Sequence, residues 1–110
     1  MVVKKYLDLF KNQSSASSVV IQNTNCDTMS LSISGSFSSI TLKIQGTNTF
    51  DSTNYFDVAA IKMSDLSVCQ QITATGLYTV SIEGMANIKV EITAISGGDA
   101  TVKARLVSAI

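Results

Sequence analysis

Apolar and polar residues alternate one by one along much of this chain, and this alternation restricts the fold more than any other feature. Within residues 78–83, for example, Tyr78, Val80 and Ile82 are separated by Thr79 and Ser81. Successive side chains of a β-strand point to opposite faces, so the pattern predicts strands with one buried and one solvated face. Five segments follow it, and three less regular candidates bring the expected number of strands to about eight. The regular segments are residues 29–33, 40–45, 78–83, 88–94 and 100–106, and the less regular ones are 18–22, 55–61 and 68–73.

The pattern predicts an all-β fold, a single antiparallel β-sandwich of the jelly-roll or immunoglobulin-like kind. Sheets with one dry face are typically antiparallel, and two such sheets bury their dry faces against each other. A chain of 110 residues is long enough for one domain with its own core. We expect the core to contain the large inward-pointing residues of these strands, which are Leu31, Ile33, Leu42, Ile44, Tyr78, Val80, Ile82, Ile88, Val90, Ile92, Val102 and Leu106.

The first seventeen residues differ from the rest, so we divide the chain into residues 1–17 and a β-sandwich domain of residues 18–110. Residues 2–12 fit a helix and a strand equally well, and residues 12–18 form a polar stretch rich in serine. This stretch is either a surface loop after a first strand, or a spacer that lets residues 1–11 dock on a neighbouring subunit as an arm. The residues through which such an arm would make contact are Tyr6, Leu7, Leu9 and Phe10.

A hairpin is expected near the C-terminus, where two alternating segments flank Ser96-Gly97-Gly98-Asp99. Both segments carry their apolar residues at even positions, so directly opposed residues must have position numbers with an even sum. A two-residue turn breaks this rule, which favours a loop of three or five residues or a β-bulge. In each allowed register Glu91 would face Lys103 or Arg105.

The composition removes several classes of chemistry. The chain has no histidine and its net charge is zero. Without histidine there is no Ser-His or Cys-His nucleophile pair, and without net charge there is no electrostatic attraction to nucleic acid or an anionic membrane. We therefore expect a protein that is not an enzyme, holds no cofactor or metal, and binds neither nucleic acid nor membrane. We also expect Cys26 and Cys69 to stay unbridged, because we see no secretory signal. The stretch that follows the first lysines is short and contains Asp8, so it does not form the apolar region of such a signal.

Three aromatic residues, Phe50, Tyr55 and Phe56, cluster around one loop. They could anchor the loop to the core, form a platform for a glycan, or contact another subunit. Between them, residues 51–54 place Asp and Asn three positions apart, which is typical of an Asx turn at the tip of a hairpin. The same spacing supplies too few oxygen ligands for an ordinary calcium loop.

The order of several motifs resembles a small β-sandwich module of tailed bacteriophages and prophages. These motifs are ITLKIQGT at residues 40–47, YFDVAAI at 55–61, TGLYTVSIEGMANIKVEITAISGG at 75–98 and ATVKARLV at 100–107. Three departures stand out: residues 51–54 lack the glycine of the family turn, Tyr55 replaces a tryptophan, and the closing GRA motif is missing. Proteins of this kind are virion accessory components, such as capsid decoration proteins, head-fibre bases and tail-associated modules.

The resemblance implies a capsid decoration protein that binds the outer surface of the major capsid lattice. It implies a homo-oligomer, with a trimer favoured, that is made in the host cytoplasm and located on the exterior of the virion. The alternative is a tail- or fibre-associated module that recognises a host glycan through the loop of residues 50–56. In both cases the partner is a virion or host component and no cofactor is expected.

Overall fold

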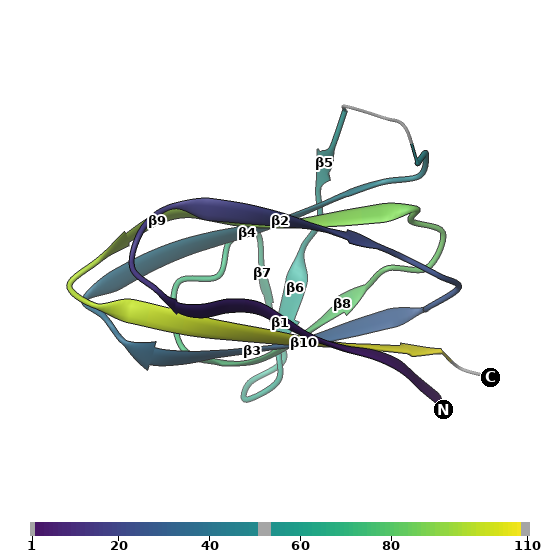
Figure 1. The fold of residues 1–110 in the computed structure, drawn as a ribbon. Coiled ribbons are helices and arrows are strands. Elements are labelled where there is room, and N and C mark those ends of the chain that lie inside the picture. Colours follow the sequence, from purple (N-terminus) through teal and green to yellow (C-terminus); the bar gives the residue numbers. More distant parts are fainter. Residues whose placement is uncertain (1, 51–53, 109–110) are drawn as a thin grey trace.

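The computed structural model describes residues 2–50 and 54–108, which form two antiparallel sheets packed face to face (Figure 1). Ten strands are assigned within these residues, and every pairing between them is antiparallel. The predicted β-sandwich is therefore confirmed. The six-stranded sheet runs in the order β1 (Val2–Gln13), β10 (Asp99–Ser108), β3 (Thr28–Ser36), β8 (Gly76–Ser81), β6 (Ala60–Lys62) and β7 (Ser67–Cys69). The four-stranded sheet runs in the order β2 (Ser17–Gln22), β9 (Asn87–Ser96), β4 (Ser39–Thr47) and β5 (Phe56–Asp57).

All twelve residues predicted for the core are buried between the two sheets. Tyr78 is the largest fully buried side chain, and its hydroxyl donates a hydrogen bond of 2.9 Å to the carbonyl of Ala74. Burial of the ring raises the pKa of Tyr78 above its ordinary value. Burying one large aliphatic side chain contributes roughly 1.5–3 kcal/mol, so this shared core is the main source of stability.

The alternation in β9 is interrupted by a β-bulge, which the sequence did not predict. Thr41 pairs with Ala94 and the next residue, Leu42, pairs with Ile92, so Thr93 is an additional residue on β9. The bulge reverses the faces beyond it. Ala94, which was expected to point inward, is exposed, and Ile95 packs against the core in its place.

The predicted hairpin between the last two strands is wrong, because β9 and β10 belong to different sheets. Glu91 lies opposite Lys43 on β4 and does not face Lys103 or Arg105. The even-sum rule holds only for strands that pair, whereas two strands in facing sheets can both turn their even residues inward. Periodicity therefore identified the buried face correctly and the partner strand incorrectly.

The connection from β9 to β10 crosses between the sheets next to a second crossing, the connection from β3 to β4. The backbone N–H of Ser38 donates to the carbonyl of Ser96 at 2.9 Å, and Asp99 pairs with Ser36. Gly97 and Gly98, with φ angles of 74° and 149°, occupy a region that side chains rarely adopt. The two crossings thus form one end of the sandwich.

The N-terminal segment is a strand, which decides between the helix and the strand left open by the sequence. β1 runs along β10 from Val2 opposite Ser108 to Gln13 opposite Ala100, with three irregularities in register. The docking of an arm on a neighbouring subunit stays a prediction.

The central segments also differ in detail from their expected limits. The candidate strand 55–61 divides into β5 and β6, which join opposite sheets. Of the candidate strand 68–73, only its beginning lies in β7, while Ile72 forms an isolated bridge with Leu42. Cys26 is buried, Cys69 is half-buried, and both are free thiols. The part of the chain that the structure describes contains no helix suited to spanning a membrane.

Candidate functional site

The outer face of the six-stranded sheet carries a continuous row of side chains across all six strands. Ser30 lies at its centre, opposite Thr79 on one side and Arg105 on the other. Directly opposed residues of antiparallel strands have Cβ atoms about 5 Å apart, so the side chains of the row are close neighbours. From β7 to β1 the row is Val68, Ile61, Thr79, Ser30, Arg105 and Tyr6.

One end of this row is apolar although it points to solvent. Val68 is 66% exposed, and Leu77, on the next level of β8, is 51% exposed. Ile61 and Met63 are exposed beside them. Leu77 lies opposite Ser32 on β3, whose side chain is small and polar, so no apolar neighbour on that strand covers Leu77. A concentration of exposed apolar side chains on one face is typical of a binding surface.

The middle of the same face is hollowed because its outward residues are small. Ser30 and Thr28 lie between the taller side chains of Leu77 and Arg105. The depression has a volume of about 310 Å³. We call this surface the trough, and define it by Thr28, Ser30, Met63, Leu77, Thr79 and Arg105.

The other end of the row combines an aromatic ring with a cation. The guanidinium carbon of Arg105 lies 5.4 Å from the centre of the Tyr6 ring, a distance suited to a cation–π interaction. Tyr6 is mostly exposed, so the pair has a surface open to a partner. Tyrosine, methionine and arginine are enriched at protein interfaces, and the trough with its margins contains all three.

The turn between β6 and β7 holds the apolar end of the row in place. The backbone N–H and the hydroxyl of Ser67 donate to the carboxylate of Asp65 at 3.0 and 2.7 Å. These hydrogen bonds, chiefly the one from the hydroxyl, lower the pKa of Asp65. The turn therefore fixes the start of β7, from which Val68 points outward.

The four N-terminal residues predicted to make contacts separate in the structure. Tyr6 points outward beside the trough, whereas Leu7 and Leu9 are half-buried against the core. Phe10 is only 5% exposed and is itself a core residue. Sequence reasoning missed Ile61, Val68 and Leu77. The signal that could have found them is an apolar residue at a position where the alternation of the strand predicts an outward side chain.

The three aromatic residues of the predicted loop contact lie at the opposite sheet. Phe50 and Phe56 are 66% and 70% exposed. Tyr55 is half-buried, with the Lys89 ammonium 5.6 Å from the centre of its ring. The side-chain amide of Asn87 donates to the carbonyl of Phe50 at 3.1 Å. The Asx turn predicted at residues 51–54 lies, apart from Asn54, outside the described residues.

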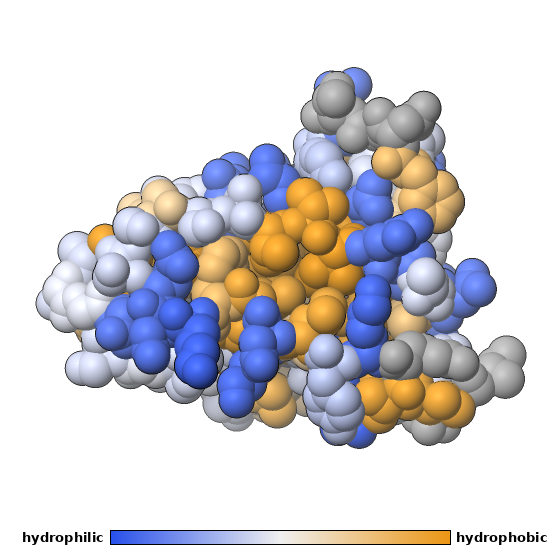
Figure 2. Space-filling view, viewed as in Figure 1, coloured by the Kyte–Doolittle hydropathy of each residue, from blue (hydrophilic) through white to orange (hydrophobic). Residues whose placement is uncertain are grey.

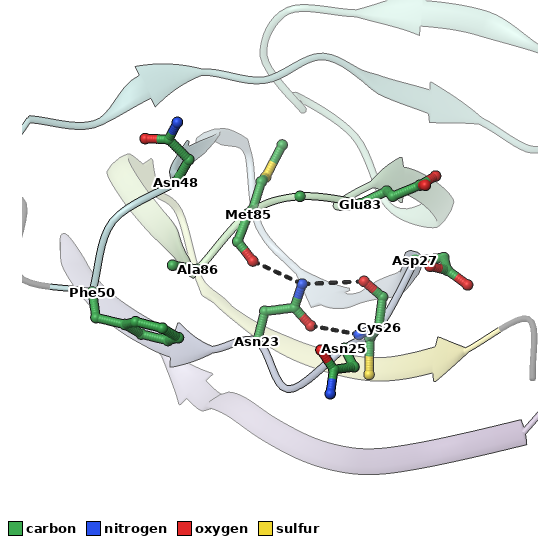
Figure 3. Close-up of a pocket in the computed structure, with 10 residues that line it drawn as sticks. Asn23, Asn25, Cys26, Asp27, Asn48, Phe50, Glu83, Met85 and Ala86 are labelled. Carbon is green, nitrogen blue, oxygen red and sulfur yellow. Dashed lines mark hydrogen bonds between the residues drawn. The ribbon is translucent and has the colours of Figure 1, made fainter.

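A pocket of about 430 Å³ opens beside Phe50, at the end of the sandwich where the β2–β3 and β8–β9 loops meet (Figure 3). Asn23 is buried at its base. The side-chain amide of Asn23 donates to the carbonyls of Cys26, Ile82 and Met85, and its oxygen accepts from the N–H of Cys26. Because both polar atoms of the Asn23 side chain are engaged in these hydrogen bonds, its role is structural: it links the two loops. The pocket is lined by Asn23, Asn25, Cys26, Asp27, Asn48, Phe50, Glu83, Gly84, Met85 and Ala86.

The polar groups at the mouth of this pocket are amides and carboxylates. Figure 3 shows Asn48, Asp27 and Glu83 around the opening, with the Phe50 ring at one side. Within residues 2–50 and 54–108, no three potential metal-ligating side chains converge. Planar amides, carboxylates and an exposed ring are groups that can hydrogen-bond and stack on a sugar.

Comparison with known proteins finds two solved structures that share this fold. The crystal structure of SPBc2 prophage-derived protein YomS aligns with a TM-score of 0.86 at 18% identity, covering 98% of this chain and 96% of YomS. The crystal structure of PBSX exported protein XepA aligns with a TM-score of 0.89 at 21% identity, covering 98% of this chain. The chain spans 39% of the length of XepA. A search of curated protein sequences gave no significant match.

At these identities the two structures establish a shared fold. One of them is described as prophage-derived. The sequence itself matches the family model named XepA over residues 8–106, from within β1 to within β10. The match extends over most of the chain, and the chain therefore belongs to the XepA family.

Proposed function

We propose that this chain is a non-enzymatic phage structural protein that decorates the capsid by binding the major capsid protein through the trough. The observation that carries the proposal is the gathering of exposed apolar side chains on one outer face of the sandwich. Leu77 in the trough, and Val68 and Ile61 beside it, do not stabilise the isolated domain by pointing to water, whereas a protein partner would remove them from water.

The contrast between the apolar end of the row and the outer face of the four-stranded sheet supports this orientation. On the four-stranded sheet the outward residues include Lys43 opposite Glu91, and the Lys43 ammonium lies 3.8 Å from the Asp57 carboxylate. A face of paired charges suits permanent contact with water. We infer that the trough meets the lattice and that the charged face points away from the particle.

The proposed location is the exterior of the virion. The family relative XepA is described as an exported protein, and a place outside the host cell suits a particle surface. The partner is then the major capsid protein or another virion protein, and the homo-oligomer expected from the sequence is part of the same proposal.

The trough can be tested by placing a charge on it. We expect Leu77→Lys to weaken binding to phage heads that lack this protein by about 10-fold to 100-fold, because a buried ammonium loses its hydration. Leu77 is half exposed and points outward, so the sandwich should remain folded. The measurement is a co-sedimentation titration with purified heads.

The matched control is Ala94→Lys, which adds the same charge to an exposed position on the opposite outer face. This variant should bind heads like the unmodified protein. Equal binding by both lysine variants, with unchanged unfolding midpoints, would remove the trough as the docking surface.

A second candidate function is recognition of a host glycan by a tail- or fibre-associated module. It is favoured by the exposed rings of Phe50 and Phe56 and by the amide-lined pocket beside Phe50. Stacking of a sugar on these rings would need no charge and no metal.

The glycan hypothesis predicts that Phe50→Ala and Phe56→Ala each reduce binding of the isolated protein to host cell walls by 10-fold or more. Their binding to heads should not change, because both residues lie outside the trough. Binding to walls that survives both substitutions together would contradict this function.

A further inference from the structure

The outer face of the six-stranded sheet has a groove along β3, because the outward residues of β3 are smaller than those of its two neighbours. Ser32 lies opposite Leu77 on β8 and opposite Lys103 on β10, and Ser30 lies opposite Arg105 on β10. Both serines are half-buried, whereas the three larger side chains are exposed on either side of them. A depression of about 240 Å³ at this level joins the trough, because both are lined by Ser30, Leu77 and Arg105.

The two sides of this groove differ in chemistry. On the β8 side the N–H of Met63 donates to the carbonyl of Leu77 at 2.9 Å, and both side chains are exposed. We call these two residues the apolar wall. On the β10 side Lys103 and Arg105 are exposed, and we call them the basic wall. Figure 2 shows hydrophilic side chains at intervals along the margin where β1 and β10 run.

The cations of the basic wall are available to a partner. Asp8 lies opposite Lys103 on β1, but among the described residues no carboxylate forms an ion pair with Lys103 or Arg105. Arg105 stacks on Tyr6 through the face of its guanidinium. Stacking leaves the N–H groups at the edge of a guanidinium able to donate to a carboxylate.

The spacing of these two cations matches that of an extended chain. Lys103 and Arg105 are two residues apart on one strand, so their Cα atoms are roughly 7 Å apart. Alternate side chains of an extended peptide have the same spacing and the same direction. Two acidic residues separated by one other residue can therefore meet both cations at once. The residue between them then points to the other side of the groove, where the apolar wall lies.

We propose that this groove binds an extended segment of a partner protein in which acidic and apolar residues alternate. The acidic side chains lie against the basic wall, and the apolar side chains lie against the apolar wall. The hydroxyls of Ser30 and Ser32 lie under the segment and can hydrogen-bond to its backbone. The inference rests on the proposed function, because it gives the chemistry of the segment that a virion protein would place on this face.

The first test measures the binding of synthetic fluorescent peptides by anisotropy at neutral pH. The protein should bind a peptide of repeated Glu-Leu pairs about tenfold more tightly than a peptide of repeated Lys-Leu pairs, and added salt should weaken this binding. A third peptide has the same composition arranged as Glu-Glu-Leu-Leu blocks. It keeps the charge and the apolar content without the alternation, and it should bind more weakly than the Glu-Leu peptide.

Charge reversal on the basic wall gives a second test. The double variant Lys103→Glu, Arg105→Glu should bind the Glu-Leu peptide about tenfold more weakly and should prefer the Lys-Leu peptide, because charge sets the choice. The control Ala94→Glu adds a carboxylate to the opposite outer face and should leave the preference unchanged. Asp8→Asn should strengthen Glu-Leu binding, because it removes a negative charge beside Lys103. Circular dichroism checks that each variant is folded.

Three results would overturn the inference. They are equal affinity for the Glu-Leu and Lys-Leu peptides, equal affinity for the Glu-Leu and Glu-Glu-Leu-Leu peptides, and an unchanged preference in the folded double variant. Failure of the proposed function is read separately, from the titration with heads. Heads that bind the wild type and the double variant equally well would remove this inference and leave capsid binding intact. A clear peptide preference in a protein that does not bind heads would remove the capsid partner and leave the groove.

Discussion

Replacing Gly98 by alanine should cost about 4 kcal/mol or more of unfolding free energy, among the largest effects of a single substitution. A Cβ at this position would overlap the carbonyl oxygen of Ser36 and lie 3.1 Å from the Cα of Phe37. Both atoms are backbone of the neighbouring crossing, which cannot rotate away. The φ angle of 149° adds strain of its own for any residue with a side chain. Most small domains have only about 5–15 kcal/mol to lose.

The matched control is Gly84→Ala. Gly84 also has a positive φ, 83°, but a Cβ there would meet no atom within 4 Å. It should therefore cost only the backbone strain, about 1–2 kcal/mol. Urea unfolding curves of both variants give the comparison. Similar midpoints for Gly98→Ala and Gly84→Ala would mean that the two crossings do not pack as tightly as described.

The second large effect is expected for Asn23→Ala, which should lower the unfolding free energy by about 3 kcal/mol. The substitution removes the amide that joins the β2–β3 loop to the β8–β9 loop. The N–H of Cys26 and the carbonyls of Cys26 and Met85 then lose this partner in a largely buried place. Only backbone hydrogen bonds would then join the two loops, such as the one of 2.8 Å from the Asn23 N–H to the Ala86 carbonyl.

Asn48→Ala provides the comparison, because Asn48 lines the same pocket and is exposed. It should change the unfolding free energy by less than about 0.5 kcal/mol, as ordinary surface substitutions do. Thermal or urea unfolding measures both variants. An Asn23→Ala protein as stable as the Asn48→Ala protein would show that the tie between the loops is dispensable.

Alternation along the chain was sufficient to predict the sandwich and its core, because the inward-pointing, apolar positions of a half-buried strand recur every two residues. It could not predict which strands pair, and so β9 and β10 were joined as a hairpin although they lie in different sheets. Glu91 has the same outward parity whether its neighbour is Lys103 or Lys43. The choice between them depends on the crossing at Gly97 and Gly98, which is a tertiary feature.

The candidate site was less accessible to sequence reasoning than the core. Tyr6 was singled out as part of an N-terminal contact, and it lies at one end of the row on the six-stranded sheet. The apolar residues of that row, Ile61 and Val68, come from β6 and β7, which are three residues long and lie in the less regular segments of the sequence. The outward position of Leu77 follows from the position of Tyr78 in the core, because adjacent residues of a strand point to opposite faces of the sheet.

The pairing of β1 with β10 has a consequence for how the protein is made. Val2 lies opposite Ser108, so the first strand of the chain can complete its hydrogen bonds only after the last strand has left the ribosome. During synthesis the apolar side of β1, including Phe10, stays exposed until β10 is available to pair with it. Completion of the six-stranded sheet therefore waits for the synthesis of β10, and until then β1 should be open to chaperones.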